Sequence, residues 1–339
     1  MSDDGILILG ADDVGTLLAG REQEMMDEVG RAYRAHGAGQ SSLPHSTFLR
    51  FPGNDTDRII ALPAFLGEGF QVAGLKWIAS FPGNLERGMA RASAVLVLNS
   101  CQTGRPEAIL EGSLISAYRT AASAALAARV FLGGRPPEAA GFVGAGFINR
   151  EIARFIGAAL PGIGRLAVFD LDAGRASRFA ADLRDSPSPP VVAEVAPSLD
   201  SILRSCPLVS FATTAIRPHV ADLSACPPGA AILHVSLRDL SPQAILGSDN
   251  VVDDVDHVSR AQTSIHLAEQ LTGSRDFVRC TLAEILEGTA SPRRDETAVT
   301  VFSPFGLGVL DVALGKRVLA LALGAGRGTT IPSFFSGIL

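Results

Sequence analysis

The stretch from residue 139 to 150, AAGFVGAGFINR, constrains the fold of this chain most. A short apolar run over residues 140–143 ends at Gly144-Ala145-Gly146, and an amphipathic helical pattern begins at Phe147. Strand, tight glycine turn and helix therefore follow one another in the order that a dinucleotide-binding fingerprint requires. The stretch predicts the first strand and helix of a Rossmann domain.

The two glycines of this turn have distinct tasks in such a site. Gly144 makes the tight turn, and Gly146 lets the main chain approach a pyrophosphate, whose charge lies against the N–H groups at the start of the helix. Asn149 stands where the third glycine of the fingerprint belongs. An ordinary strand-to-helix turn without a ligand therefore stays open as the alternative at this point.

An acidic residue after the next apolar run favours NAD as the ligand. Residues 165–169 predict a central parallel strand that ends at Asp170, which is 170 − 146 = 24 residues beyond the second glycine. A carboxylate there accepts hydrogen bonds from both ribose hydroxyls of NAD, whereas a 2′-phosphate within about 4 Å of it would cost roughly 1 to 4 kcal/mol. Asp170 therefore predicts NAD rather than NADP.

The composition is typical of a compact enzyme with two domains. The chain has 339 residues, of which 47% are hydrophobic and 19% charged, so it is too long for one ordinary core and too apolar to be disordered. Its net charge of −6 and the lack of a basic stripe argue against nucleic acid as a partner. Since the sequence shows neither a basic, apolar leader nor a run of ~18 apolar residues, we expect a cytoplasmic protein that does not cross a membrane.

The cysteines indicate neither a disulfide framework nor a metal site. Cys101, Cys206, Cys226 and Cys280 are scattered and form no CxxC pair. We therefore expect reduced, mostly buried thiols and no bound metal.

Changes of hydrophobic period divide the chain into an outer domain and an insertion. A helix over residues 21–36 is followed by strand-like alternation, which predicts one antiparallel or mixed sheet. Glycines and prolines at 133–137 then end an alanine-rich helix over residues 114–131 and mark a domain boundary. We expect an outer α+β domain from residues 1–133 and 305–339, with a Rossmann domain, residues 134–304, between them. The expected outer strands are 6–9, 46–51, 58–64, 70–80, 93–99 and 106–111, and the expected last helix is 309–323.

Strands and helical stretches continue to alternate after Asp170. This alternation predicts a doubly wound parallel sheet of the α/β class. The expected strands are 191–195, 208–211, 230–235 and 250–252, and they are followed by helices over residues 258–271 and 282–287.

Two cationic residues lie in otherwise apolar stretches of the outer domain. Lys76 is inside the strand VAGLKWIASF, and Arg119 is inside the helix SLISAYRTAASAALAA. A cation is costly to bury unless it meets an anion, and a guanidinium can hold a carboxylate at two points. We expect Lys76 to meet an anion and Arg119 to hold a carboxylate; pairing with buried acids for structural reasons is the alternative.

Asp239 is the candidate reactive acid of the inserted domain. It follows the strand within AAILHVSLRD at its carboxyl end, which is where ligands bind in an open parallel sheet. We expect it to face the nicotinamide. The alternative is that it only caps the helix that starts at Ser241-Pro242.

Several runs, in a fixed order over most of the chain, resemble the ornithine cyclodeaminase/mu-crystallin family. The runs are GLKWIASFPGN (74–84), the turn Thr103-Gly104, SLISAYRTAASAA (113–125), GFVGAGFIN (141–149), FATTA (211–215), HVSLRDLSP (234–242) and VFSPFGLGVLDVALG (301–315).

The resemblance implies a Rossmann domain inserted into a substrate-binding domain that also forms a homodimer, with NAD as the cofactor. Lys76 and Arg119 match residues that grip the substrate α-carboxylate, and Asp239 matches the acid beside the reacting carbon, so Lys76 and Asp239 are the expected catalytic residues. We also expect an apolar cleft to raise the pKa of Asp239 toward neutrality. The expected cofactor-binding residues are Thr120, Gly144, Ala145, Gly146, Phe147, Ile148, Asn149, Asp170, Thr213, Thr214 and Ser236.

Two departures from the family pattern concern the substrate. The family commonly has an arginine just after the proline that corresponds to Pro44; here His45 follows it, with Arg50 farther along the chain, and both are candidate substrate-binding residues. Ser303-Pro304 replaces the usual Lys-Ser, and no residue clearly matches the acid that binds the side-chain amine of ornithine.

The implied activity is NAD-dependent oxidation of an amino-acid C–N bond to an imine, followed by attack on that imine. The runs KWIASFPGN and SLRDLSP resemble the group of this family that acts on N-(2-amino-2-carboxyethyl)-L-glutamate, and this resemblance implies that substrate, with water as the nucleophile. The products would be 2-oxoglutarate and L-2,3-diaminopropionate, a siderophore precursor. Ornithine cyclodeaminase, alanine dehydrogenase and ketimine reductase activities stay open, as does a non-catalytic, crystallin-like binding role.

Overall fold

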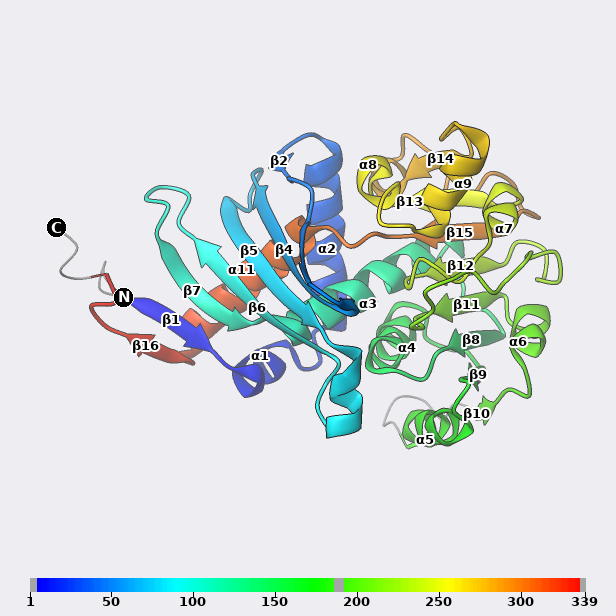
Figure 1. The fold of residues 1–339 in the computed structure, drawn as a ribbon, viewed down its shortest axis with the longest axis horizontal. Coiled ribbons are helices and arrows are strands. Elements are labelled where there is room, and N and C mark those ends of the chain that lie inside the picture. The colour runs from blue at the N-terminus through cyan, green and yellow to red at the C-terminus, as the bar shows by residue number, and fades with distance from the viewer. Residues whose placement is uncertain (1–4, 186–191, 336–339) are drawn as a thin grey trace. The chain divides into compact units, whose positions relative to one another are not determined.

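The computed structural model describes residues 5–185 and 192–335, and the chain divides into two compact units. Unit 1 combines Met1–Arg119 with Leu307–Leu339, and unit 2 is Thr120–Gly306, so unit 2 is an insertion in the sequence of unit 1 (Figure 1). The chain enters unit 2 inside a helix, before the boundary expected at residue 133, and returns to unit 1 at Leu307.

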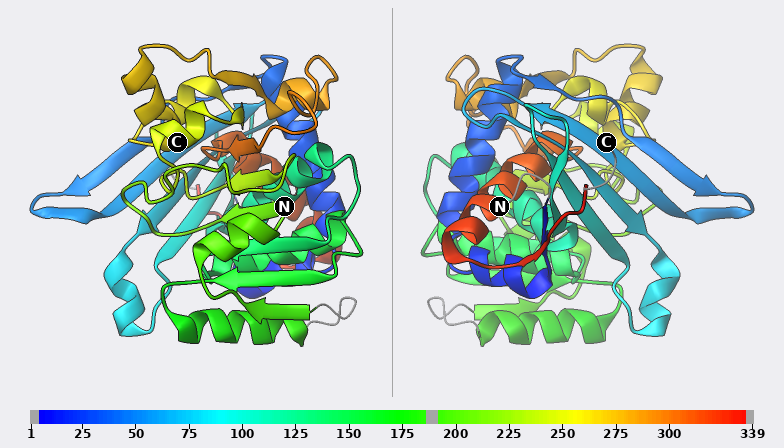
Figure 2. Two further views of the ribbon diagram at one scale, coloured as in Figure 1. Left: turned by 90° about the vertical axis from the view of Figure 1, so that its right-hand side faces the viewer. Right: turned by 90° about the vertical axis from the view of Figure 1, so that its left-hand side faces the viewer.

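Alternation of inward and outward residues builds the mixed sheet of unit 1. Its long strands β4 (Asn54–Leu66), β5 (Val72–Ser80) and β6 (Ala92–Asn99) pair antiparallel, and the β3–β4 hairpin extends beyond the neighbouring strands (Figure 2). Leu62 of β4 is buried, whereas Trp77 of β5, on the other face, is exposed. The sheet order is β16-β1-β7-β6-β5-β4-β2, with β3 beside β4; its other strands are β1 (Ile6–Leu9), β2 (Ser41–Ser42), β3 (Thr47–Phe51), β7 (Pro106–Glu111) and β16 (Thr329–Ile331).

Helix α11 (Gly308–Ala325) covers the buried face of this sheet, against β4, β5 and β6 (Figure 1). Gly74 of β5 allows the close approach, because a Cβ there would overlap the main-chain oxygen of Val97 and lie 3.1 Å from Val312 of α11. The other helices of unit 1 are α1 (Ala11–Leu18), α2 (Glu22–Gly37), the 3-10 helix η1 (Pro82–Arg87) and the first part of α3 (Gly112–Phe131).

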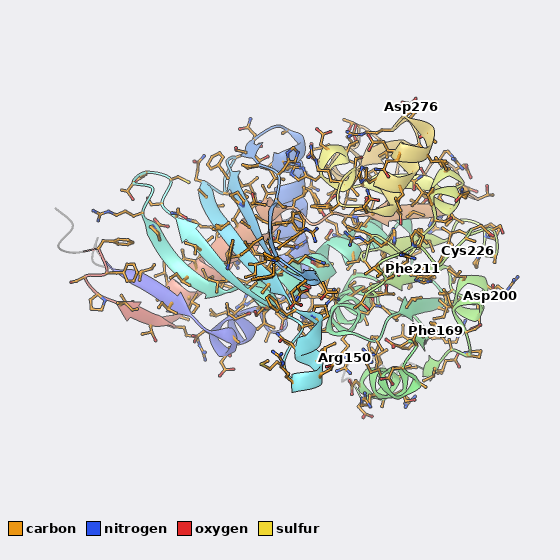
Figure 3. The ribbon with its side chains drawn as sticks, viewed as in Figure 1. Arg150, Phe169, Asp200, Phe211, Cys226 and Asp276 are labelled. Carbon is orange, nitrogen blue, oxygen red and sulfur yellow. The ribbon has the colours of Figure 1, made fainter. Side chains whose placement is uncertain are left out.

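The described strands of unit 2 form a parallel sheet. Its central strands are short, apolar and buried on both faces, which is typical of a sheet that helices cover on both sides. Figure 3 marks Phe169 and Phe211, the last residues of β9 and β11, on the two neighbours of β8 at the carboxyl edge. The order is β10-β9-β8-β11-β12-β15-β13-β14, with β8 (Ala139–Val143), β9 (Arg165–Phe169), β10 (Val192–Val195), β11 (Leu208–Phe211), β12 (Ala231–His234), β13 (Asp249–Val252), β14 (Val278–Thr281) and β15 (Thr300–Ser303).

Side-chain caps start several helices of unit 2. Asp172, Ser241 and Thr263 each accept a main-chain N–H three residues farther along, which satisfies a donor that the helix leaves unpaired. No helix in the described ranges is both long and apolar enough to span a membrane. The helices are α4 (Phe147–Ala159), α5 (Ala173–Arg184), α6 (Leu199–Ser205), α7 (Pro242–Leu246), α8 (Val255–Val258), α9 (Ser264–Thr272) and α10 (Leu282–Leu286).

The predicted fold class, a doubly wound parallel sheet inserted in a mixed α+β unit, is confirmed. The single helix predicted over residues 258–271 is wrong. Ala261 and Gln262 adopt left-handed φ angles of 54° and 56°, and Thr263 starts a separate helix there. The predicted strands do not include β14, β15 or β16. Val191, at the start of a predicted strand, lies outside the described residues.

Candidate functional site

Unit 2 forms a turn at the carboxyl end of β8 that requires glycine. Gly144 has a φ of 93°, and a Cβ there would lie 2.6 Å from the main-chain oxygen of Ala212, in the loop after β11. Gly146 is the N-cap of α4, and no atom lies within 4 Å of the place that its Cβ would take. The open space before the helix N-terminus fits a diphosphate, which the first N–H groups of α4 would bind.

Asn149 compensates for the missing third glycine of the fingerprint. Its side chain is fully buried, and Nδ2 donates hydrogen bonds to the main-chain oxygens of Val143 at 2.9 Å and Gly144 at 2.7 Å. Ser210 of β11 donates to its Oδ1 at 2.7 Å. The amide therefore ties the glycine turn to β8 and β11, and it faces the protein rather than open space.

Asp170 joins the glycine turn to the end of β9. Its Oδ2 accepts the main-chain N–H of Ala145 at 2.8 Å, and its Oδ1 accepts that of Asp172 at 2.8 Å. Arg175 Nε lies 3.9 Å from Oδ1. Each carboxylate oxygen keeps a lone pair for a ribose hydroxyl, so the position fits the adenosine ribose of NAD.

The other residues expected to contact the cofactor lie in the first turn of α4, in the loop after β11 and in the middle of α3. Phe147 is exposed and Ile148 half-buried in the first turn of α4. Thr213 is half-buried and Thr214 exposed in the loop after β11, and Thr120 is half-buried in α3. Their cofactor contacts stay predictions.

Asp239 is the centre of a hydrogen-bonded cluster that lies past the ends of β11 and β12. Its Oδ1 accepts hydrogen bonds from Thr213 Oγ1 at 2.5 Å and from His219 Nε2 at 3.0 Å, and its Oδ2 accepts one from Ser236 Oγ. His234 Nε2 accepts the main-chain N–H of Asp239 at 3.1 Å. The side chain of Asp239 has no exposed surface, whereas that of His219 is 41% exposed.

The expectation that the pKa of Asp239 rises toward neutrality is wrong. Burial raises this pKa, but the hydrogen bonds that the carboxylate accepts from Ser236 and Thr213 hold the pKa of Asp239 below its ordinary value. An aspartate in this setting stays ionised at neutral pH. The alternative, a helix cap, is also wrong, because Ser241 caps α7 through the N–H of Ala244.

Sequence reasoning misses the two histidines of this cluster. His234 ends the apolar strand β12, is fully buried, and places Nδ1 3.3 Å from Ser303 Oγ of β15. Its position, as a polar residue at the end of an apolar strand, is a feature of the sequence that could have indicated a functional role for His234. His219 comes from the loop after β11, and no spacing in the sequence links it to Asp239.

Lys76 and Arg119 of unit 1 meet at Asp311 of α11. Lys76 Nζ donates to Asp311 Oδ2 at 2.7 Å, and Arg119 Nε donates to Oδ1 at 3.1 Å. Ser116 Oγ accepts hydrogen bonds from Lys76 Nζ at 3.1 Å and from Arg119 Nη2 at 3.3 Å. Two cations and one anion leave this buried cluster with one net positive charge, which suits a single further carboxylate.

Asp311 is the buried acid that the alternative interpretation of Lys76 and Arg119 requires. The carboxylate-binding role of these cations therefore stays a prediction. Burial and the charge of Arg119 lower the pKa of Lys76 to about 8, although Asp311 opposes this shift. Sequence reasoning misses Asp311 because it lies 192 positions from Arg119, in a helix that is otherwise apolar.

Arg50, expected as a substrate ligand, belongs to a second cationic group, which we call the arginine cluster: Arg50, Arg58 and Arg91. Arg50 of β3 lies opposite Arg58 of β4, and Arg58 lies opposite Ser80 of β5. Arg91 directly precedes β6, and its buried Nε has no hydrogen-bond partner in the described part of the chain. None of the three forms an ion pair with a described carboxylate. The other candidate, His45, is exposed in the loop before β3.

The three arginines repel one another. Burial lowers the pKa values of Arg58 and Arg91, and the charges of Arg50 and Arg58, respectively, lower them further. Because alternate residues of a strand share a face, Arg58 and Ser80 face the same side of the sheet as Lys76, whose Cα lies about 13 Å from that of Ser80. Positive charge that no described carboxylate pairs with, on this face, indicates a place for an anion.

Thiol and metal chemistry have little support in the described residues. All four cysteines are free, and only Cys101 is exposed. Burial raises the pKa values of Cys226 and Cys280 to about 11, which disfavours their reactive thiolates. Within the described ranges, no group of three or more histidine, cysteine, aspartate or glutamate side chains is arranged to hold a metal ion.

Comparisons with known proteins agree with this fold. The chain is 27% identical to alanine dehydrogenase of Archaeoglobus fulgidus, over 97% of this chain and 98% of the relative. It is 26% identical to N-((2S)-2-amino-2-carboxyethyl)-L-glutamate dehydrogenase of Staphylococcus aureus, over 96% and 98%. Its structure is similar to that of Delta(1)-pyrroline-2-carboxylate reductase of Thermococcus litoralis in complex with NADH and L-proline, with a TM-score of 0.88, 25% identity, and 96% and 100% of the two chains covered.

A family model matches nearly the whole sequence. Residues 7–325 match the ornithine cyclodeaminase/mu-crystallin family, and this range includes the glycine turn, the Asp239 cluster and the Lys76–Arg119 pair. The chain therefore belongs to the ornithine cyclodeaminase/mu-crystallin family.

Proposed function

We propose that this protein is an NAD-dependent oxidoreductase that converts an amino-acid C–N bond into an imine and hydrolyses it. The glycine turn, the open space before α4 and Asp170 fit NAD. The two relatives named above are dehydrogenases, and the structural neighbour binds NADH and L-proline, which supports an enzyme of this class. When bound, the nicotinamide accepts a hydride from the substrate.

We further propose N-(2-amino-2-carboxyethyl)-L-glutamate as the substrate, and the arginine cluster carries this proposal. This molecule has three carboxylates. The Lys76–Arg119–Asp311 cluster offers net charge for one of them. Arg50 and Arg58, on the same face of the sheet as Lys76, and Arg91, which feels the charge of Arg58, offer charge for the others.

The residues of each unit have separate tasks in this reaction. In unit 1, Lys76 and Arg119 would hold the α-carboxylate of the glutamate part, and thereby fix the carbon that loses hydride. In unit 2, the Asp239 cluster would serve the proton transfers that accompany oxidation and the addition of water. The products would be 2-oxoglutarate and L-2,3-diaminopropionate.

Alanine dehydrogenase activity is the second candidate, because the relative with that activity is 27% identical over almost the whole chain. Alanine has one carboxylate, so it would leave the arginine cluster without a ligand. Ornithine also has one carboxylate, and a crystallin-like binding protein would not need the cluster for turnover. The number of carboxylates on the preferred substrate therefore separates these functions.

The test is turnover of a small substrate panel by the purified protein with NAD. The panel contains N-(2-amino-2-carboxyethyl)-L-glutamate, L-alanine, L-ornithine and L-proline, and NADH absorbance and mass spectrometry follow the products. We expect NADH, 2-oxoglutarate and 2,3-diaminopropionate in equal amounts from the first compound. Conversion of ornithine to proline and ammonia without net NADH would keep the family and reject this substrate.

Variants of the arginine cluster test its role directly. Arg58→Gln should raise the KM for the tricarboxylate about 10-fold or more, since a charged hydrogen bond is worth roughly 1.5 to 3 kcal/mol. The KM for any monocarboxylate that the enzyme also oxidises should stay constant. Arg87→Gln, an exposed arginine of η1, is the matched control and should leave both constants unchanged.

We also propose that the protein is a homodimer formed through the outer face of the unit 1 sheet. Leu49, Trp77 and Val95 are exposed on that face, and Trp77 lies directly opposite Val95 on the neighbouring strand. Large apolar side chains that adjoin on a sheet surface favour burial against a partner. The resemblance to dimeric family members points to a second copy of this chain.

A further inference from the structure

The Asp239 cluster contains a buried anion, the carboxylate of Asp239, and an exposed base, the imidazole of His219. We propose that His219 is the catalytic residue that exchanges protons with the substrate, and that Asp239 is the positioning residue that orients it. This inference rests on the proposed amino-acid dehydrogenase activity.

Asp239 has no surface with which to touch a substrate. Both of its carboxylate oxygens already accept hydrogen bonds, from Thr213 and His219 on one side and from Ser236 on the other. Its side chain is fully buried. A direct base must come within hydrogen-bond reach of the proton that it takes, and of these two side chains the exposed imidazole of His219 has the surface for that approach.

The main chain holds His219 rigidly beside Asp239. The N–H groups of His219 and Val220 both donate to the main-chain oxygen of Asp239 at 2.9 Å. Val220 and Leu240 also form a parallel β-bridge, so the two segments are joined at successive residues. The imidazole is therefore presented from a fixed backbone although it lies in a loop.

The carboxylate of Asp239 selects the tautomer of His219. An ionised carboxylate only accepts hydrogen bonds, so Nε2 of His219 carries the proton of the 3.0 Å contact and Nδ1 carries the free lone pair. The side chain has 41% of its surface exposed, and it has no other hydrogen bond within the described ranges. Nδ1 is thus an accessible base that a buried anion supports, an arrangement known from acid–base catalysis.

His219 lies at the edge of the sheet where the cofactor is expected. It follows β11, the direct neighbour of β8, and the loop after β11 contacts the glycine turn, since a Cβ on Gly144 would lie 2.6 Å from Ala212. Ligands of open parallel sheets bind at this carboxyl edge.

The proposed proton transfers balance the reaction. Nδ1 of His219 takes the proton of the substrate's secondary amine while hydride leaves the α-carbon for the nicotinamide, and the C–N single bond becomes a C=N bond. After that proton passes to solvent, Nδ1 takes a proton from the water that adds to the imine carbon. It gives this proton to the nitrogen, which forms a carbinolamine. Nδ1 then takes the hydroxyl proton and passes it to the nitrogen as the C–N bond breaks, which releases the oxo acid and the free amine.

Chemical rescue distinguishes a base from a structural residue. His219→Ala should lower kcat about 10²- to 10⁴-fold while the NAD dissociation constant and the melting temperature stay close to wild type. Added imidazole should restore at least a tenth of the lost rate, because the exposed site admits it. Asp239→Asn should also lower kcat, but imidazole should not rescue it. His266→Ala, a histidine of α9, is the control and should neither lose activity nor respond to imidazole.

The assay uses whichever amino acid of the panel the wild-type protein oxidises, so an incorrect substrate does not affect it. A wild-type protein that makes no NADH from any of them rejects the proposed function. His219→Ala with kcat within about threefold of wild type rejects only the present inference, and so does loss of activity with a lowered melting temperature and no rescue. Nitrogen NMR of the cofactor-free protein gives an independent readout: we expect the Nε2–H tautomer of His219, and an Nδ1–H tautomer would overturn the assignment.

Discussion

The partners of a single buried charge decide whether it can titrate near neutral pH. Asp239 receives hydrogen bonds that outweigh its burial, so it acts as a fixed negative charge. Lys76 has Asp311 as a partner, but burial and the nearby Arg119 dominate and lower its pKa to about 8. The lysine, rather than the aspartate, is therefore the buried group whose charge changes within an ordinary assay range.

This shift predicts a pH-dependent KM. Below pH 8, Lys76 is charged and its cluster keeps one net positive charge; above pH 8, it loses its proton and the net charge falls to zero. The KM for an amino-acid substrate should therefore rise with pH above 8, by up to about tenfold per unit. Lys76→Arg, which stays charged, should show a much flatter profile. An identical rise in both proteins would assign the effect to the substrate amine instead.

At the scale of elements, the turn after β8 is held by side chains from three segments. Asn149 of α4 binds the ends of β8, Ser210 of β11 binds Asn149, and Asp170 at the end of β9 binds the N–H of Ala145. The departure from a three-glycine fingerprint is therefore compensated, because the amide ties the turn to both β8 and β11.

Asp170 also holds the glycine turn by accepting the N–H of Ala145. Asp170→Asn is therefore a sharper test of cofactor choice than removal of the side chain. The asparagine keeps an oxygen for the N–H of Ala145 and loses the charge. The NAD dissociation constant should rise about tenfold, while NADP should bind no more weakly, since repulsion of its 2′-phosphate is gone. Calorimetric titration measures both constants, with Asp182→Asn of α5 as the control. A wild-type preference for NADP would contradict the assignment.

Local patterns in the sequence predict structural features that depend on residues close together in the chain. They miss features that depend on the pairing of distant segments. The glycine turn and Asp170 follow from strand, turn and helix signals within one βαβ stretch. Arg58 meets Arg50 only through strand register, which a shift of one residue would change completely. Asp311 comes from a distant helix, and its pairing with Lys76 depends on how that helix packs on the sheet.

At the scale of the whole molecule, the proposed dimer predicts that substitutions on its interface lower the molecular mass of the protein in solution. Trp77→Glu combined with Val95→Glu places charge on the apolar outer face of the unit 1 sheet, so it should convert a dimer into a monomer in sedimentation experiments. Circular dichroism should stay unchanged, because both side chains are exposed in the single chain. Leu271→Glu, an exposed leucine of α9, is the control. A wild-type monomer would refute the dimer.

The position of β15 in the sheet of unit 2 bears on how this protein is made. β15 lies between β12 and β13, yet β12 ends at residue 234 and β15 begins at residue 300, so 300 − 234 − 1 = 65 residues separate them. A ribosome that adds ~5–20 residues per second needs about 3 to 13 s to make that stretch. Until then β12 and β13 have unpaired edges, which are sites of aggregation. Helix α11, the cover of the other sheet, follows β15 directly, so a nascent chain holds two incomplete cores until its C-terminal segment leaves the ribosome.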